Sequence, residues 1–101
     1  MNREIFIARR LFTALASARR LTILSHLKHG PMCLSDFVVA LNTAPSTLTQ
    51  HLKVLVRSGL LATQKRGRLT YYSISEKGSA NVMASLQYFT AMAADQDEPS
   101  C

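Results

Sequence analysis

A run of polar and cationic side chains between residues 46 and 68 is the part of this chain best suited to chemistry. Short hydroxyl and amide side chains come first, and lysines and arginines follow: Ser46, Thr47, Thr49, Gln50, Lys53, Arg57, Lys65, Arg66 and Arg68. No carboxylate lies between Asp36 and Glu76. Amides and hydroxyls can hydrogen-bond to base edges, whereas Lys and Arg bind phosphates. The pattern therefore indicates a polyanion, double-stranded DNA above all, as the partner.

The first part of this run predicts one amphipathic helix over residues 46–57. At about 100° per residue, its apolar side chains fall on one stripe, which we expect to face the core. That stripe consists of Leu48, Leu52, Leu55 and Val56. The opposite edge carries base-reading side chains near the helix start, with Lys53 and Arg57 placed for phosphates nearer its end. An ordinary amphipathic helix with a solvated basic face remains the alternative for this pattern taken alone.

A two-stranded cationic hairpin is predicted directly after the helix. Residues 60–64 and 68–74 have the composition of strands, and residues 65–67 are predicted to connect them, with Gly67 supplying any positive φ that the turn needs. Such a tip can lie along a DNA backbone or enter a minor groove beside the helix. Its contacts would contribute salt-dependent affinity that is independent of sequence.

Two helices are predicted before this unit. Apolar spacing indicates the first over residues 3–16, and Ser17 is the expected N-cap of the second. Gly30 and Pro31 are expected to end that second helix, because Pro cannot continue it. The side chains that we expect it to bury are Leu21, Ile23, Leu24 and Leu27.

The next segment predicts a pair of helices joined by a tight turn. Residues 32–34 are expected to be extended, and Ser35 is the predicted N-cap of a third helix. Residues 42–44 form the turn, and Pro45 begins the fourth helix. With the hairpin and a fifth helix that runs to about Ala94, this order predicts a mainly α winged helix-turn-helix fold, α-α-α-α-β-β-α.

The first and last helices are more apolar than a monomer of 101 residues needs. The side chains concerned are Ile5, Phe6, Leu11, Phe12, Leu86, Tyr88, Phe89 and Met92. They either cover one another within a subunit or pair across a two-fold axis, and we favour a homodimer with two DNA-reading helices one DNA turn apart. We expect one DNA-binding and dimerisation domain over residues 1–94 and a disordered acidic tail over residues 95–101.

Composition agrees with a nucleic-acid partner and argues against other classes. Twelve Lys and Arg against six acids give a formal net charge of +6, which is typical of a nucleic-acid footprint. No apolar run approaches the roughly 20 residues that cross a bilayer, and no signal peptide is visible. We therefore expect a cytoplasmic protein without a membrane contact. No glycine-rich phosphate loop and no Ser-His-Asp spacing is present, so no enzyme is predicted.

Two cysteines, Cys33 and Cys101, are too few for a disulfide framework. Three interpretations of Cys33 stay open: a buried small residue, a redox- or electrophile-responsive thiol near the DNA-reading unit, or a metal or metalloid site shared with Cys101. Soft metals and metalloids need several thiolates to be held tightly. We therefore predict no metal ligands and no resident cofactor, and leave a metalloid or thiol modification at Cys33 as an effector hypothesis.

Three blocks of the sequence resemble the ArsR/SmtB family of winged-helix repressors. Residues 14–24, ALASARRLTIL, are similar to its ALSDPTRLRIL opening, and residues 46–55, STLTQHLKVL, resemble its STVSxHLKVL recognition helix. Residues 67–74, GRLTYYSI, are similar to its GRxxYYxL wing. The resemblance spans about residues 10–75. It implies a homodimeric repressor that binds a palindromic operator and releases it when an inducer binds.

The resemblance also bears on the contacts and the inducer. The family's DNA contacts map onto Ser46, Thr47, Thr49 and Gln50, with Lys53 and the wing cations nearby. Arsenic-sensing members open the third helix with Cys-x-Cys, whereas here Ser35 follows Cys33 where the second thiol would be. Zinc and nickel sensors place His and acids on the last helix, and residues 79–94 contain neither.

One alternative comes from another functional class. A winged-helix module that docks on an acidic protein surface would carry the same basic face and never read DNA. Salt dependence separates the two, because binding to DNA weakens log-linearly as salt rises.

Overall fold

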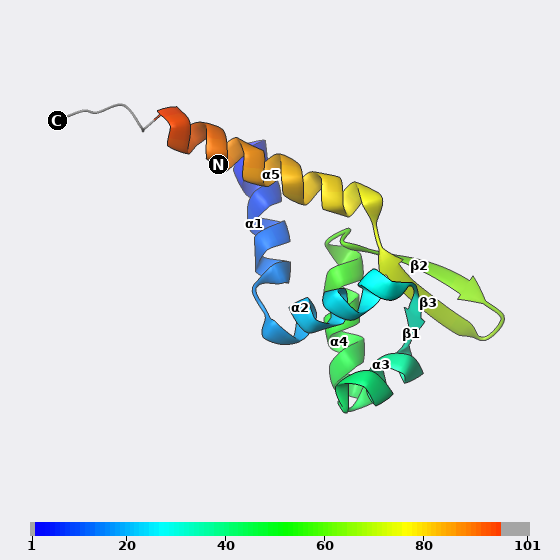
Figure 1. The fold of residues 1–101 in the computed structure, drawn as a ribbon. Helices are drawn as coiled ribbons and strands as arrows, with labels where there is room; N and C mark the ends of the chain where they lie inside the picture. Colours follow the sequence, from blue (N-terminus) through cyan, green and yellow to red (C-terminus); the bar gives the residue numbers. More distant parts are fainter. Residues whose placement is uncertain (1, 96–101) are drawn as a thin grey trace.

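The structure is a computed structural model that describes residues 2–95 (Figure 1). The elements run in the order α1 (Arg3–Leu15), α2 (Ala18–His26), the 3₁₀ turn η1 (Leu27–His29), β1 (Met32–Cys33), α3 (Leu34–Leu41), α4 (Pro45–Arg57), β2 (Leu61–Arg66), β3 (Leu69–Ile74) and α5 (Glu76–Asp95). This order confirms the predicted winged helix-turn-helix. None of these helices is long and apolar enough to cross a membrane. The predicted tail lies outside the described residues from residue 96 onward.

The core lies where α2, α3 and α4 meet the sheet. Its most deeply buried large side chains are Phe37, Ile23, Leu48, Leu52 and Leu55. The expectation that Leu21 is buried is wrong, because this side chain is 50% exposed. Leu21 and Ile23 are two positions apart in the sequence, so their side chains point about 160° apart on a helix. Once Ile23 and Leu27 face the core, Leu21 must face outward.

The helix starts follow local chemistry. The hydroxyl of Ser17 accepts a hydrogen bond from the Arg20 backbone N–H at 3.3 Å, which confirms the predicted cap of α2. Pro45 stands in the first turn of α4, also as predicted. Before Gly30, however, the last turn of the second helix tightens into η1. Helix ends often tighten in this way, because i→i+3 bonds satisfy carbonyls that the α-helix leaves free.

The predicted N-cap of the third helix is wrong by two residues. Cys33 is the cap, and Ser35 lies inside α3. The carboxylate Oδ2 of Asp36 accepts a hydrogen bond from the Cys33 backbone N–H at 3.1 Å and one from its thiol at 3.3 Å. Asp36 at the third helical position therefore closes a capping box in which a thiol replaces the usual hydroxyl. A cysteine is not among the residues that signal a cap in a sequence.

The sheet has one strand more than the predicted hairpin. Its order is β1-β3-β2, and β1 pairs antiparallel with β3 through Met32 opposite Tyr72 and Cys33 opposite Tyr71. The hairpin turn is also one residue later than predicted: Gly67 and Arg68 form it, while residues 65 and 66 belong to β2. Gly67 has φ +65°, as a two-residue turn with the native strand twist requires.

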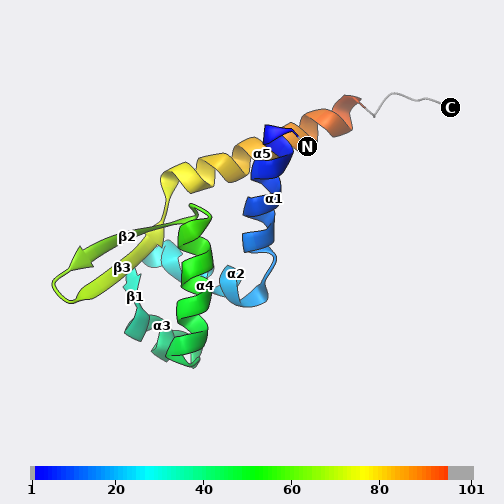
Figure 2. The same ribbon diagram turned by 180° about the vertical axis from the view of Figure 1, so that it is seen from behind.

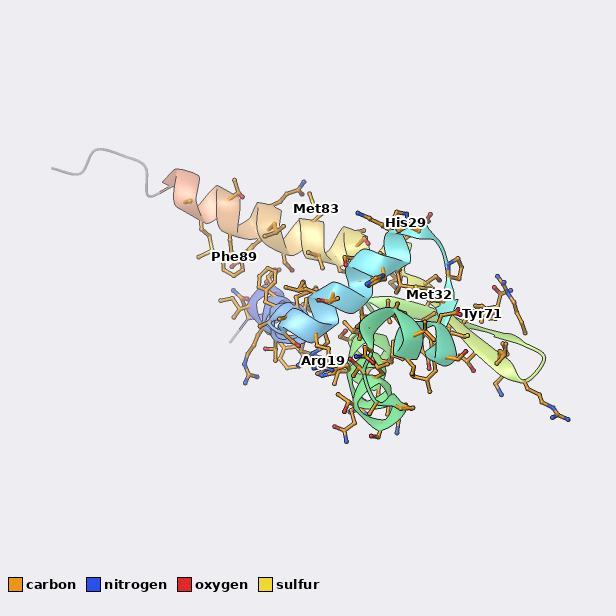
Figure 3. The ribbon with its side chains drawn as sticks, turned by 60° about the horizontal axis from the view of Figure 1, so that its bottom comes forward. Arg19, His29, Met32, Tyr71, Met83 and Phe89 are labelled. Atoms are coloured by element: carbon orange, nitrogen blue, oxygen red, sulfur yellow. The ribbon has the colours of Figure 1, made fainter. Side chains whose placement is uncertain are left out.

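The elements surround α4 in a simple arrangement. Helix α4 lies between α1 on one side and the β2–β3 hairpin on the other, in both views (Figures 1 and 2). Helix α5 crosses α1, where the rings of Phe12 and Phe89 lie 6.2 Å apart. Figure 3 shows Phe89 extending from α5 toward α1. The hairpin extends away from the helices, so its turn projects beyond them.

Candidate nucleic-acid interface

The polar edge of α4 faces outward. Ser46, Thr47, Gln50, Lys53 and Arg57 are exposed, and Thr49 is half-buried. The opposite stripe is closed, since Leu48, Leu52 and Leu55 are at most 1% exposed. Pro45 contributes to this orientation by fixing where the helix starts, and the leucine spacing then fixes its rotation about its axis. The edge predicted from the sequence is thus presented to solvent along the whole helix.

Val56 departs from the prediction that it belongs to the core stripe, because it is 36% exposed. At about 80° from Leu48, it lies at the border of the buried stripe. It lines a cleft of about 370 Å³ between α4 and the hairpin. The residues lining that cleft are Leu52, Lys53, Val56, Arg57, Thr63 and Tyr72. The two cations of α4 therefore stand on the side that faces the wing.

The wing holds one of its cations in a defined position. The guanidinium of Arg66 lies over the ring of Tyr71, 4.7 Å from its centre, and its Nη2 donates to Oε1 of Gln64 at 3.3 Å. The three residues share a face because Gln64 pairs with Tyr71 across the hairpin and Arg66 is two residues further along. Lys65 is exposed on the opposite face, and Arg68 is exposed in the turn. The wing thus presents cations on both faces and at its end.

A contact not anticipated from the sequence connects α2 with the helix-turn-helix. Nη1 of Arg19 donates to Oγ1 of Thr43 at 2.9 Å, and Thr43 belongs to the turn before α4. Figure 3 shows Arg19 on the side of α2 next to α4. The signal that the sequence offered was the Arg19-Arg20 pair in a stretch without acids between Glu4 and Asp36. Arg19 is a further cation close to the start of α4.

His51 is half-buried on the flank of α4. Burial lowers its pKa below the ordinary value of 6.5, and the neighbouring Arg20 and Arg19 lower it further. A lowered pKa favours the neutral imidazole near neutral pH. His51 therefore adds no charge to the interface, which leaves hydroxyls, amides and permanent cations as its chemistry.

Cys33 lies at the base of this unit rather than on its surface. It is 4% exposed, and its Sγ lies 3.1 Å from Oγ of Ser35 beside the Asp36 carboxylate. Within residues 2–95, no group of three or more His, Cys, Asp or Glu is placed to hold a metal ion. Cys101, the second effector candidate, lies outside the described residues.

Comparison with known proteins identifies the family. The sequence profile described as "Bacterial regulatory protein, arsR family" matches residues 17–63. The HTH-type transcriptional regulator Rv2034 of Mycobacterium tuberculosis is 30% identical over 80 residues, which cover 79% of this chain and 75% of that protein. The chain belongs to the ArsR family. This assignment confirms the resemblance seen in residues 14–74.

Other transcriptional regulators are also similar to this chain. The HTH-type transcriptional repressor SmtB of M. tuberculosis is 30% identical over 82 residues, covering 80% of this chain and 61% of SmtB. The chain thus spans about three-fifths of that relative's length. The structure of HlyU from Vibrio vulnificus is 32% identical, covers 81% of this chain and 86% of HlyU, and has a TM-score of 0.64. HlyU from Vibrio cholerae is 29% identical, covers 91% and 97%, and has a TM-score of 0.72.

Family membership establishes the general class of this protein and whether it is an enzyme. ArsR-family proteins are DNA-binding transcriptional regulators, and the matched proteins are named as regulators or repressors of the helix-turn-helix type. They are not enzymes, which confirms the prediction made from the missing catalytic motifs.

Proposed function

We propose that this ArsR-family chain is a repressor that binds a palindromic operator in double-stranded DNA as a homodimer. One observation carries the proposal: the exposed hydroxyl, amide and cationic edge of α4 lies beside a basic hairpin. No acid is present from residue 37 to residue 75 to repel a phosphate backbone. A bacterial operator lies in the cytoplasm, so the proposal places the chain there.

Each part of the interface has its own role in this proposal. Ser46, Thr47, Thr49 and Gln50 enter the major groove and address base edges, for which Gln suits adenine. Lys53 and Arg57 bind phosphates on either side of that groove and set the register. The wing cations Lys65, Arg66 and Arg68 contact the backbone or the minor groove next to it. Stacking on Tyr71 restricts the guanidinium of Arg66 to one face of the wing.

Exposed apolar side chains on α1 and α5 support the homodimer. They are Ile5, Phe6, Met83, Leu86, Phe89 and Met92. Several exposed apolar side chains on two helices that pack together are typical of an interaction site in a small protein. A two-fold axis through α1 and α5 would bury it and place two α4 helices on one face of a duplex. We propose that residues 1–94 form this DNA-binding and dimerisation domain.

The test is DNA binding by purified protein, using duplexes selected from a random pool and measured by fluorescence anisotropy. We expect Gln50→Ala to relax the sequence preference, because a base contact is lost. Arg66→Ala should weaken binding to all duplexes alike, because only backbone contacts are lost. If wild-type protein shifts no duplex even at low salt, the protein-docking alternative is favoured instead.

The direction of regulation needs a separate measurement. SmtB of M. tuberculosis is named a repressor, whereas HlyU of V. cholerae is named a transcriptional activator. We expect repression here, so a reporter driven by the selected operator should rise in expression when Gln50→Ala replaces the wild-type chain. A fall in expression would instead make the chain an activator.

We further propose that an inducer releases the operator, and Cys33 is the residue through which a thiol-directed inducer would act. Because Cys33 caps α3, the first helix of the helix-turn-helix, a change at its sulfur would disturb the support of α4. Operator binding should be compared for reduced, peroxide-treated and metal-loaded protein, in wild type and in Cys33→Ser. Equal binding in every state would make Cys33 a structural cap and remove the thiol link.

A further inference from the structure

A second cationic cleft lies on the other side of α4. Its volume is about 240 Å³, and it is formed between α1 and the end of α4. The polar residues that line it are Arg9, Arg10, Thr13, Arg57 and Ser58. None of the residues lining it is acidic. No Asp or Glu occurs between Glu4 and Asp36, so no acidic residue lies within four positions of Arg9 or Arg10 in the chain.

One hydrogen bond joins the two helices that form this cleft. Nη2 of Arg10 donates to the backbone carbonyl of Arg57 at 3.4 Å, which joins α1 to the last turn of α4. The bond uses one of the five N–H donors of that guanidinium. Arg9 is exposed beside it, and Arg57 also lines the cleft. Arg9 and Arg10, adjacent cations on α1, thus line one cleft, and their like charges favour the binding of an anion there.

The chemistry of the site selects its ligand. Guanidinium groups bind phosphate through paired, charge-assisted hydrogen bonds, and Thr or Ser hydroxyls add neutral ones. Thr13 is exposed at the edge of the cleft, where its hydroxyl can contribute. A phosphate group is therefore the anion that these side chains suit.

The position of the cleft indicates the source of that phosphate. Helix α4 lies between α1 and the hairpin (Figures 1 and 2). Arg57 lines both this cleft and the one that faces the wing. A helix in the major groove has one DNA strand's backbone on each side of it. The wing cations stand on one side of α4, and Arg9 and Arg10 stand on the other.

We propose that Arg9 and Arg10 bind backbone phosphates of the operator, on the side of α4 opposite the wing. This inference rests on the proposed DNA-binding function. It extends the interface from the helix-turn-helix and wing onto α1. Because these contacts touch only phosphates, they raise affinity for every sequence and determine how the recognition helix is seated.

The experiment compares Arg9→Gln, Arg10→Gln and the double variant with Arg3→Gln, a control on the same helix. Arg3 is exposed and lines neither cleft. Affinity for selected and unrelated duplexes should be measured between about 50 and 200 mM salt, where each lost phosphate contact lowers the slope of log K against log salt by about 0.9. We expect the double variant to bind all duplexes about tenfold more weakly or worse, with a smaller slope and unchanged preference. Arg3→Gln should behave as wild type.

Three results would overturn the inference. If the double variant keeps wild-type affinity and slope while Gln50→Ala loses its preference, α1 makes no DNA contact although the chain binds DNA. If Arg10→Gln lowers the melting temperature but leaves the slope unchanged, Arg10 is only a structural contact to α4. If inorganic phosphate stabilises wild type and not the double variant, with DNA binding equal in both, the cleft binds a free anion. Absence of DNA binding by wild type would refute the proposed function itself.

Discussion

Helices α4 and α5 are both amphipathic, yet only on α4 are the main apolar side chains buried within the chain. The leucines of its stripe, Leu48, Leu52 and Leu55, are at most 1% exposed, because α2, α3 and the sheet surround it. On α5, Met83 is 55% and Leu86 is 46% exposed, because that helix packs mainly against α1. The comparison teaches that an apolar stripe predicts that a helix face will be buried, but it does not identify the element or partner that buries it. For α5, we propose a second copy of the chain.

The largest effect is expected inside the α4 stripe. Leu52→Ala should lower the free energy of unfolding by about 2–5 kcal/mol, because it leaves a cavity that the packed surroundings fill only partly. Urea unfolding monitored by circular dichroism measures this loss. Since the contacts of Leu52 lie within one subunit, the loss should be the same at every protein concentration. A loss that depends on protein concentration would contradict the view that the α4 stripe, unlike α5, is buried within one subunit.

The next effect is expected on the exposed side of α5. Leu86→Glu should weaken the proposed dimer by about 2–4 kcal/mol, as for a central interface residue. Sedimentation velocity should then show monomer at concentrations where wild type is dimeric. Apparent stability should also lose its dependence on concentration.

Val39 offers the matched control for that substitution. It is 82% exposed on α3, away from α1 and α5, so Val39→Glu should leave the dimer intact. Equal sedimentation of wild type, Val39→Glu and Leu86→Glu would remove the homodimer from the proposal.

A smaller effect is expected where the start of α5 packs against the connection between α4 and β2. Gly78 is buried in the first turns of α5, and a Cβ there would meet the backbone carbonyl of Gly59 and lie 2.9 Å from Cα of Leu60. Gly78→Ala should therefore cost about 1–3 kcal/mol, because backbone atoms cannot move aside as a flexible side chain would. Helix propensity alone predicts the opposite, a gain of roughly 1 kcal/mol. Thermal unfolding will show whether Gly78→Ala is less stable than wild type, as the contact predicts, or more stable, as helix propensity predicts.

The smallest effect concerns pH. Burial, Arg20 and Arg19 lower the pKa of His51 in the folded protein, so near pH 6 the unfolded chain binds a proton there more readily. The free energy of unfolding should therefore decrease as pH falls below about 6.5 and be unaffected by this group above it. His51→Gln should flatten that part of the profile, measured by urea unfolding from about pH 5 to about pH 8. An unchanged profile would show that His51 does not contribute to the pH dependence of the free energy of unfolding.

Local rules predicted α4 and its surroundings well. Pro45 at the helix start, the leucine repeat and Gly67 in the turn each act through neighbours within a few residues. Such features are readable from a sequence because the physical cause and its effect are adjacent in the chain. The assignments of Ser46, Gln50 and the wing cations to DNA remain predictions that the DNA-binding experiments test.

The failures share another cause. Residues 32 and 33 are extended as predicted, but the sequence did not show that they pair with β3, 38 or more positions later in the chain. Cys33 replaced Ser35 as the cap because the Asp36 carboxylate reaches back to its N–H and thiol. Leu21 was expected inside because it is apolar, but the rotation of α2 is decided by which of its faces α4 covers. Apolar character alone does not select a face.

By itself, the sequence determined the helix-turn-helix, the hairpin, the excess of cations and the family to which the chain belongs. These depend on side-chain type and short-range spacing, which a sequence states directly. Only the tertiary structure decided that a third strand joins the sheet, that Arg66 is stacked on Tyr71, and that Arg9 and Arg10 meet the end of α4. These features depend on which distant segments pack together. That packing is determined by the apolar surface that the whole chain buries, which short-range spacing does not reveal.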